Sequence, residues 1–268
     1  MIWVGTSGWL YDHWDGVFYP EDLPRSRWSA YYRQRFPVVE LNATFYRLPR
    51  ESTVVKWLHE AHGGFRYVVK GSRYITHIRR LVDCDEPVSR FIARVAPMHP
   101  ALLALLWQLP PDLRRDDDRL ATFLRLLPRT LGGAPLRHAI EFRHPSWIAD
   151  PVHALLAEHD AVNVWVSSAA MPVDFTQTTD FVYARFHGLA GGWEHDYTVD
   201  ELAPFAAALR AAGCNGVAFF NNDGKARAPH NAELFTRMLG DAAVAWDPPS
   251  DLEDARNGPR TSGRGSSG

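Results

Sequence analysis

The amino-acid sequence predicts an α/β fold: a single (β/α)8 TIM barrel over residues 1–245, followed by a disordered tail over residues 246–268. Eight short apolar runs, rich in β-branched and aromatic residues and bounded by turn residues, predict eight strands. Amphipathic helical segments separate most of these runs, which is the alternation that a parallel barrel requires. The final stretch, DLEDARNGPRTSGRGSSG, has no apolar periodicity, which predicts the tail.

The elements follow one another in a regular order. The expected strands lie at 2–7, 38–43, 66–71, 102–109, 138–142, 161–166, 181–188 and 216–222. The expected helices lie at 26–36, 51–62, 86–96, 116–127, 150–159, 198–212 and 230–240. The helix signal is clear at 198–212, because Thr198 and Glu201 form a capping-box pattern and Gly213 can end the helix.

Two features of the pattern depart from the ideal alternation or leave an alternative open. The segment after the sixth strand, SSAAMPVDFTQTTD, has no convincing helical pattern. A doubly wound open sheet is the alternative architecture, but its glycine-rich dinucleotide motif is absent from the sequence. The barrel is therefore the favoured fold.

The composition argues against several classes of protein. A chain that is 46% hydrophobic and 22% charged is typical of globular proteins, and a formal net charge of −2 gives no general attraction to nucleic acid or membrane. Cys84 and Cys214 form no CxxC pair, so neither a disulfide framework nor a thiolate metal cluster is expected. The first residues do not resemble a secretory signal and no apolar run reaches transmembrane length, which predicts a cytoplasmic location and no membrane partner.

Polar residues end several of the expected strands, and period-two counting places them on the inward face. Inward residues at the carboxyl ends of strands build the sites of barrel enzymes. A single residue of this kind is usually a salt bridge or a loop anchor, but a convergent set predicts a functional site, because buried charges are costly unless they are paired or used. The set is Glu40, Asn42, Lys70, Gln108, Glu141, Arg143, Arg185, His187 and Asn221.

The charge of this set favours an anionic substrate. Three cations, from Lys70, Arg143 and Arg185, accompany the two carboxylates, and Arg binds phosphate or carboxylate in bidentate fashion. The leading hypothesis is an enzyme, of hydrolase, lyase or isomerase type, that acts by acid/base chemistry on a small polar anion at the barrel mouth. The expected catalytic residues are Glu40, Glu141, His187 and Lys70, with no metal and no other cofactor.

Other reactions have weaker signals. Glu40 and Glu141 would suit a glycosidase pair, although the cations beside them favour salt bridges. The same carboxylates with His187 are candidate metal ligands, but neighbouring Lys and Arg would repel a cation and no HExxH motif occurs. Lys70 among other cations is a Schiff-base candidate, although anion binding is a simpler role for it.

The alternative function is nucleic-acid binding or repair. The stretch KGSRYITHIRRL after the third strand is basic and aromatic, and Arg47 and Arg50 extend it after the second strand. Such a loop can contact a phosphate backbone while its rings stack on bases, although an ordinary solvated basic face is the favoured explanation. A ligand-binding barrel without turnover is a third hypothesis. The oligomeric state has no signal in the sequence.

The first loop, within GTSGWLYDHWDGVFYP, carries an unusual density of aromatic residues. In a barrel this loop follows the first strand and lies at the mouth. Trp9, Tyr11 and Trp14 are therefore expected to wall the pocket or stack on a flat ligand, while Phe18 and Tyr19 pack the loop down.

Seven motifs in order make the sequence similar to a known family. They are GTSGWLYDHWDGVFYP, VELNATFYRLP, KGSRYITHIRRL, QLPP, EFRHPSW, RFHG and FNNDGKARAPHNAELF. From about residue 2 to residue 240 the chain resembles the YecE-like family, a domain of unknown function. The resemblance implies a TIM barrel, mostly bacterial and cytosolic, without an established reaction. The chain departs from the family pattern at Gly71, where alanine is expected, and at Trp107, where phenylalanine is expected.

The resemblance completes the expected site. The family's marked positions add Ser7 and Tyr46 to the residues found by parity, by the basic loop and by the first loop. The expected substrate-binding residues are then Ser7, Trp9, Asn42, Tyr46, Arg73, Gln108, Arg143, Arg185 and Asn221.

Overall fold

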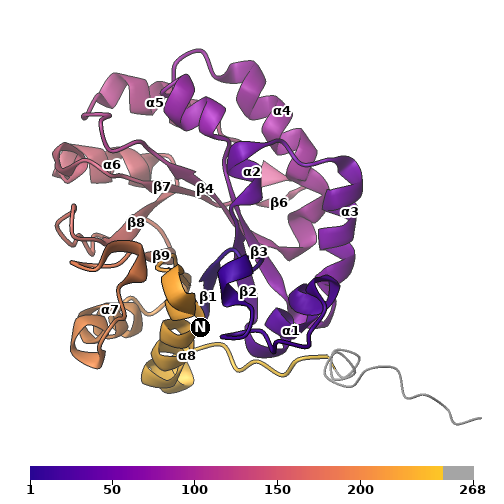
Figure 1. Cartoon of the computed structure of the whole chain (residues 1–268). Helices are drawn as coiled ribbons and strands as arrows, with labels where there is room; N and C mark the ends of the chain where they lie inside the picture. The colour runs from indigo at the N-terminus through magenta and orange to yellow at the C-terminus, as the bar shows by residue number, and fades with distance from the viewer. Residues whose placement is uncertain (250–268) are drawn as a thin grey trace, which may run out of the picture.

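The computed structural model describes residues 1–249, which form a closed barrel of eight parallel strands (Figure 1). β1 pairs with β2 on one side and with β10 on the other, so the sheet has no free edge and the open doubly wound sheet is excluded. Each of the eight expected strands is confirmed. In order around the ring they are β1 (Ile2–Ser7), β2 (Val38–Leu41), β3 (Arg66–Lys70), β4 (Leu102–Gln108), β7 (His138–Glu141), β8 (Ala161–Ser167), β9 (Phe181–Phe186) and β10 (Asn215–Phe220).

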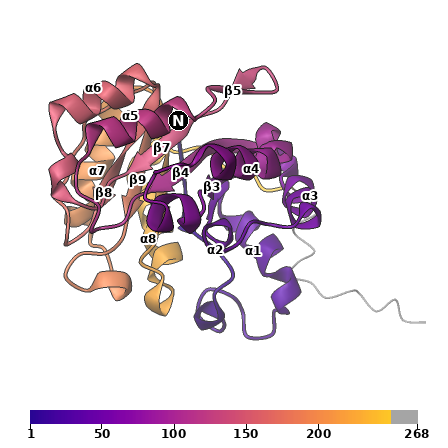
Figure 2. The ribbon, with the colours of Figure 1, turned by 90° about the horizontal axis from the view of Figure 1, so that it is seen from above.

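Helices surround the barrel, and each of the seven expected helices has a counterpart (Figures 1 and 2). The capping box of α7 forms as expected, because the Thr198 hydroxyl accepts from the Glu201 amide and the Glu201 carboxylate accepts from the Thr198 amide. A one-turn helix, α2, and a short antiparallel ribbon, β5 (Thr130–Leu131) with β6 (Ala134–Pro135), are additions. The helices are α1 (Trp28–Arg35), α2 (Ala43–Tyr46), α3 (Glu51–Glu60), α4 (Asp85–Val95), α5 (Asp117–Arg125), α6 (Asp150–Glu158), α7 (Val199–Ala211) and α8 (Arg227–Leu239).

The connection from β8 to β9 contains no helix, as the sequence indicates. Asp174 organises it instead. One carboxylate oxygen of Asp174 accepts from the amide and hydroxyl of Thr176, and the other accepts from Asn163 Nδ2 at 3.0 Å and lies 2.8 Å from His153 Nε2. Burial alone would raise the pKa of Asp174. These hydrogen bonds have the larger combined effect, so the pKa of Asp174 is lowered.

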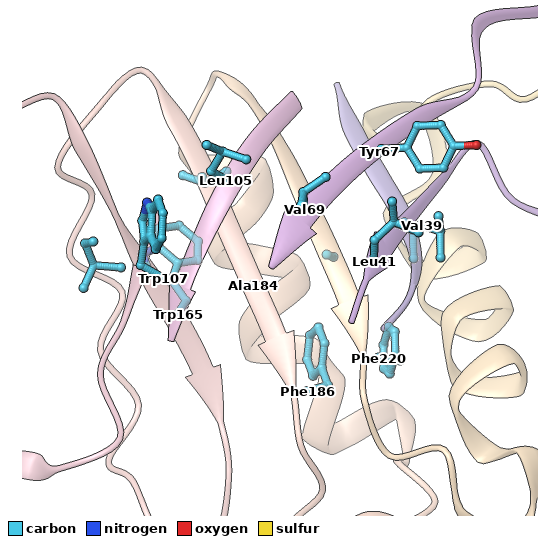
Figure 3. Packing of buried hydrophobic residues seen from close by; sticks show 14 of the residues in the cluster. Val39, Leu41, Tyr67, Val69, Leu105, Trp107, Trp165, Ala184, Phe186 and Phe220 are labelled. Carbon is cyan, nitrogen blue, oxygen red and sulfur yellow. The ribbon is translucent and has the colours of Figure 1, made fainter. Parts of the chain in front are cut away.

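Alternate residues of each strand face two different apolar cores. Inward side chains such as Val68, Leu106 and Phe219 fill the barrel, while outward side chains such as Val69, Leu105 and Phe220 pack under the helices (Figure 3). The polar residues that end the strands continue the inward row. They therefore meet at the carboxyl end of the barrel.

The two departures from the family pattern, Gly71 and Trp107, touch each other in the outward layer. A Cβ atom on residue 71 would lie 2.4 Å from Trp107 Cε3, closer than two non-bonded carbon atoms can approach. The indole is fully buried, and its Nε1 donates to His138 Nδ1 at 3.1 Å. The missing methyl at position 71 thus makes room for the larger ring at position 107.

We expect Gly71→Ala alone to lower the free energy of unfolding by about 1–3 kcal/mol, because the methyl overpacks the indole. Adding Trp107→Phe should recover part of that loss, with a coupling of about 0.5 kcal/mol or more. Urea unfolding of the wild type, both single variants and the double variant measures the cycle. Additive effects would contradict the coupling.

The chain continues in packed form past the expected domain boundary at residue 245. The Val244 amide donates to the Ile2 carbonyl, and Trp246 Nε1 donates to the Arg33 carbonyl at 2.8 Å. Trp246 also contacts the Phe65 ring. The expected tail at 246–268 therefore begins with residues that pack on the barrel, and 250–268 lie outside the described residues. No helix among residues 1–249 is long and apolar enough to cross a bilayer.

Candidate active site at the barrel mouth

A cavity of about 490 Å³ opens at the carboxyl end of the barrel, between the loops that follow β1, β2, β3 and β10. Aromatic side chains form much of its wall, and a small number of polar groups converge on it, as is usual for sites that bind small molecules. The aromatic residues are Trp9, Tyr11, Phe45, Tyr46 and Trp57, and the polar residues are Asn42, Lys70, Asn221 and Asp223.

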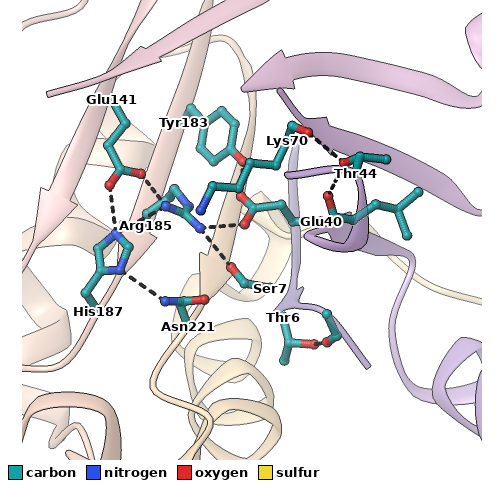
Figure 4. A network of polar contacts seen from close by, with 12 residues as sticks. Thr6, Ser7, Glu40, Thr44, Lys70, Glu141, Tyr183, Arg185, His187 and Asn221 are labelled. Atoms are coloured by element: carbon teal, nitrogen blue, oxygen red, sulfur yellow. Dashed lines mark hydrogen bonds and ion pairs between the residues drawn. The ribbon is translucent and has the colours of Figure 1, made fainter. Parts of the chain in front are cut away.

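Beneath the cavity, Arg185 binds the two carboxylates Glu40 and Glu141 (Figure 4). Its Nη2 donates to Glu40 Oε1 at 2.5 Å and lies 3.4 Å from Ser7 Oγ, and its Nη1 donates to Glu141 Oε2. All three ionised side chains are completely buried. Arg185 thus lies under the cavity and is not among the residues of its wall.

Each carboxylate has a second partner. The Tyr183 hydroxyl donates to Glu40 Oε2, and Arg143 Nη1 donates to Glu141 Oε1 at 3.1 Å. Burial would raise the pKa of Glu141, but the positive charges of Arg185 and Arg143 and a hydrogen bond from His187 hold that pKa well below its usual range. Burial and the neighbouring Glu40 raise the pKa of Tyr183. The negative charges of Glu40 and Glu141 are therefore compensated by Arg185 and Arg143.

His187 links this network to the cavity wall. Its Nε2 lies 3.0 Å from Glu141 Oε1 and its Nδ1 lies 3.2 Å from Asn221 Nδ2. A neutral ring with the proton on Nε2 satisfies both contacts, because it donates to Glu141 and accepts from Asn221. Burial lowers the pKa of His187 to about 4 despite the nearby Glu141, which agrees with that neutral tautomer.

Among the residues that line the cavity, Lys70 is the cation. Its ammonium forms no hydrogen bond or ion pair with any residue among 1–249, and its Nζ lies 4.3 Å from the centre of the Phe45 ring. Burial and the positive charge of Arg185 lower its pKa to about 8. The Thr44 hydroxyl donates to the Lys70 carbonyl at 2.6 Å and to the Leu41 carbonyl, which ties α2 to the barrel and places Phe45 beside the amine.

The structure divides the expected site residues into three groups. The buried network beneath the mouth contains Ser7, Glu40, Glu141, Arg143, Arg185, His187 and Asn221. The cavity wall contains Trp9, Asn42, Tyr46 and Lys70, together with Asn221. Two residues lie outside both: Gln108, half-buried beside Glu141 in the strand register, and Arg73, exposed on the loop after β3.

The aromatic residues of the first loop also separate into residues that line the cavity and residues that are buried. Trp9 packs against Tyr32 and Phe65 and is only 5% exposed, although it is one of the lining residues. Tyr11 lines the cavity and donates to the Ser7 carbonyl at 2.6 Å. Trp14 is completely buried, and its Nε1 donates to the Asp223 carbonyl. Trp14 therefore anchors the loop instead of walling the pocket.

The basic loop after β3 is partly neutralised by acidic partners. Arg79 forms an ion pair with Asp83 at 3.1 Å, and Arg80 pairs with Asp112 at 2.9 Å. Arg47, Arg50 and Arg73 are exposed. Positive charge near the cavity thus comes mainly from Lys70 and Arg73; together with burial, both lower the pKa of His77.

Backbone strain is concentrated at the same end of the barrel. Five of the six non-glycine residues with positive φ among residues 1–249 lie in the loops after β3 and β10, and a π-helix, Tyr74–Ile78, lies in the former. Such conformations persist only where the surrounding structure holds them, and they cluster at functional sites. The five are Arg80, Leu81, Asp83, Lys225 and Ala226.

Two contributors were not among the expected site residues. Tyr183 shares the inward parity of Arg185 and precedes it by two positions, so parity counting carried to the middle of the strand would have found it. Phe45 carried no such signal, because it reaches Lys70 through the one-turn helix α2. No group of three or more His, Cys, Asp or Glu side chains among residues 1–249 is arranged to hold a metal ion.

The family model described as "Protein of unknown function DUF72" matches residues 3–254. The chain belongs to this family. Among solved structures, a DUF72 family protein of Thermotoga maritima MSB8 is similar with a TM-score of 0.81 and 28% identity, over 90% of this chain and 100% of that one. A DUF72 family protein of Enterococcus faecalis V583, at 21% identity and a TM-score of 0.76 over 92% and 97% of the two chains, shares the DUF72 fold.

Curated relatives confirm the resemblance to YecE-like proteins. The UPF0759 protein YunF of Bacillus subtilis (strain 168) is 29% identical over 176 residues, which cover 63% of this DUF72 chain and 60% of YunF. The UPF0759 protein YecE of Escherichia coli (strain K12) is 30% identical over 152 residues, which cover 56% and 51% of the two chains. The DUF72 chain therefore matches just over half the length of these relatives.

We expect Arg185→Met to lower the free energy of unfolding by about 3–5 kcal/mol, because it leaves two buried carboxylates without their shared cation. Adding Glu40→Gln and Glu141→Gln should restore part of the loss by removing those charges. Arg115→Met is the matched control, since its ion pair with Asp117 is near the surface and its loss should change stability far less. Urea unfolding measures all of them, and equal losses for the two arginines would refute the buried-pair explanation.

Lys70→Met should raise the free energy of unfolding at pH 7 by up to about 3 kcal/mol. The folded chain releases the Lys70 proton near pH 8 while the unfolded chain keeps it to about 10.5, so the charged form destabilises the fold below pH 8. Wild-type stability should therefore gain from this group between pH 8 and 10.5, and the gain should vanish in Lys70→Met. Urea unfolding over this range tests it, with exposed Lys56→Met as the control; a loss of stability at pH 7 would contradict it.

Proposed function

We propose that the barrel mouth is the active site of an enzyme that acts by acid/base chemistry on a small polar anion, with a phosphate or carboxylate group, and that Lys70 is its central residue. The observation that carries the proposal is that the Lys70 ammonium has no counter-ion among the described residues. It is a cation on the wall of a cavity, without a protein counter-ion among residues 1–249, while both nearby carboxylates are bound by arginines. An anionic ligand would supply the missing partner.

Charge counting supports an anion. Glu40 and Glu141 are balanced by Arg185 and Arg143. Of the two acidic or basic side chains on the cavity wall itself, Asp223 contacts His13 at 3.3 Å and has a pKa raised by burial, while Lys70 has no ion pair among residues 1–249. Because a charge in a partly desolvated cavity is screened less than one at the surface, an anion there gains more from this contact.

The pKa values support Lys70 as the proton carrier. A general acid or base works best when its pKa lies near the working pH, and the pKa of Lys70 is lowered to about 8. Glu141 is held ionised by its cationic neighbours, which makes it a weak base and a poor acid. In this proposal Glu40, Glu141 and His187 position Arg185 and Asn221 and maintain the field around Lys70, with His187 available as a second, weaker base.

Nucleic-acid binding has less support. Arg79 and Arg80, which were expected to contact phosphates, pair with Asp83 and Asp112. The cavity, of about 490 Å³, has the size of a small-molecule site, and the exposed cations left on the loops are Arg47, Arg50 and Arg73.

Isothermal titration calorimetry with glycerol 3-phosphate and inorganic phosphate tests the anion site. Wild-type protein should bind both, and Lys70→Met should weaken binding by at least about tenfold, or about 1.4 kcal/mol. Lys225→Met is the matched control, because Lys225 is exposed and paired with Glu194 at 2.8 Å. Uncharged glycerol should not bind. Anion binding that is absent, or equal in all three proteins, would remove the basis of the proposal.

Turnover is tested separately by NMR of a mixture of sugar phosphates, hydroxy acids and 2-oxo acids incubated with the protein. Wild type should convert at least one component, and Lys70→Met should slow that conversion by about 100-fold or more, as expected for loss of a general acid/base. Conversion at an equal rate by Lys70→Met would show that the proton carrier is another group.

A further inference from the structure

We propose that Lys70 is a covalent nucleophile: its amine forms an imine with the aldehyde or ketone carbon of an anionic substrate bound in the mouth cavity. The inference rests on the proposed function and deepens it, because it assigns the substrate to a chemical class, carbonyl compounds that carry a phosphate or carboxylate. It also assigns the first chemical step.

The first requirement is an amine whose nitrogen is not held by an acceptor. Acid/base side chains are present next to Lys70, but their oxygens are occupied. One oxygen of Glu40 accepts from Arg185 and the other from Tyr183, and the oxygens of Glu141 accept from Arg185 and Arg143. Among the described residues no acceptor therefore competes for the Lys70 nitrogen, and Lys70 is one of the residues that line the cavity.

The second requirement is that the amine be neutral often enough to attack. Lysine nucleophiles achieve this beside a second cation or in an apolar pocket. Lys70 meets the first condition, because its side chain extends toward the buried Arg185 guanidinium (Figure 4), and burial also disfavours its charged form. The Phe45 ring, 4.3 Å from Nζ, attracts the ammonium and offsets part of this effect. Arg143 adds a further positive charge to the same surroundings.

The other lysines of the chain lack these features, which makes Lys70 distinct. The sequence contains three lysines. The Lys56 side chain is 70% exposed and lies 3.8 Å from Glu60, and the Lys225 side chain is 68% exposed and lies 2.8 Å from Glu194. Both are solvated and lie beside a carboxylate, so neither has the desolvated, cation-flanked surroundings of a nucleophilic lysine.

The third requirement is a contact for the anionic group. Arg143 Nη1 donates to Glu141, while its remaining guanidinium nitrogens have no hydrogen-bond partner among residues 1–249. Its side chain is 20% exposed and so is partly open to solvent, although Arg143 is not among the residues that line the cavity. A planar guanidinium suits a carboxylate or phosphate, and its charge adjoins Lys70.

The step balances without a further reactant. The neutral Lys70 amine adds to the carbonyl carbon, the C–N bond forms, and the carbonyl π electrons and one amine proton give a carbinolamine hydroxyl. That hydroxyl leaves as water, taking the second amine proton through solvent in the cavity, and the C=N bond forms. Hydrolysis reverses the step and restores the amine, so the lysine is regenerated in each cycle.

Reductive trapping tests the imine. The whole protein is incubated at pH 7.5 with pyruvate or glycolaldehyde phosphate and sodium cyanoborohydride, which reduces an imine to a stable secondary amine. Peptide mass spectrometry then compares alkylation at Lys56, Lys70, Lys225 and the N-terminal amine. We expect Lys70 to be modified at least tenfold faster than Lys56 and Lys225, and propanal, a neutral carbonyl compound, to lose most of that preference.

One variant, Lys70→Arg, and the wild type together separate this inference from the proposed function. Lys70→Arg keeps the positive charge and cannot form an imine, so it should retain glycerol 3-phosphate binding within about tenfold while losing the trapped adduct and the turnover. Wild type that binds phosphate but shows no preference for Lys70 in trapping overturns the imine and leaves the anion site intact. Wild type that neither binds anions nor traps overturns both.

Discussion

The contact of Arg185 with Glu40 and Glu141 is the interaction on which the mouth of the barrel depends. The three side chains come from strands that are not neighbours in the ring, and all are completely buried. A buried charge is tolerated only where its partners are in place, because desolvation costs several kcal/mol per ion. The three strands must therefore be positioned together before any of them is stable at this end. That requirement makes the network a constraint on geometry more than a source of net stability.

The same pairing determines what is left for chemistry. Because the guanidiniums satisfy the carboxylates, the network presents little charge of its own to the cavity, and Lys70 stands apart as an unpaired cation beside Phe45. Burial of that cation destabilises the fold, as its lowered pKa indicates. Destabilising groups are retained in proteins chiefly where function requires them. The loops at the same end contain residues in strained backbone conformations, so they too lower the stability of the mouth relative to the rest of the barrel.

Much of the fold was predictable because its signals are local. The alternation of apolar runs with amphipathic segments predicts the strands and helices, and period-two counting predicts that Glu40, Glu141, Arg185 and His187 face inward. The coupling of Gly71 with Trp107 was not predictable: each departs from the family pattern by itself, and only adjacent strands bring the Gly71 backbone against the indole. The pairing of Gly71 and Trp107 shows how a change of one methyl group is absorbed by a neighbour across the sheet.

The sequence by itself determined the barrel, the parity of its strands and the set of polar residues at their carboxyl ends, because periodicity and turn chemistry act over a few residues. Only the tertiary structure decided how those residues divide their roles. Arg185 and Glu40 are 145 positions apart, so their contact depends on closure of the ring, and that contact turns three expected site residues into a buried support. The tertiary structure also gives different roles to two rings of the first loop, because Trp14 anchors the loop while Tyr11 lines the cavity. Pairing over such distances depends on packing, which local sequence patterns do not specify.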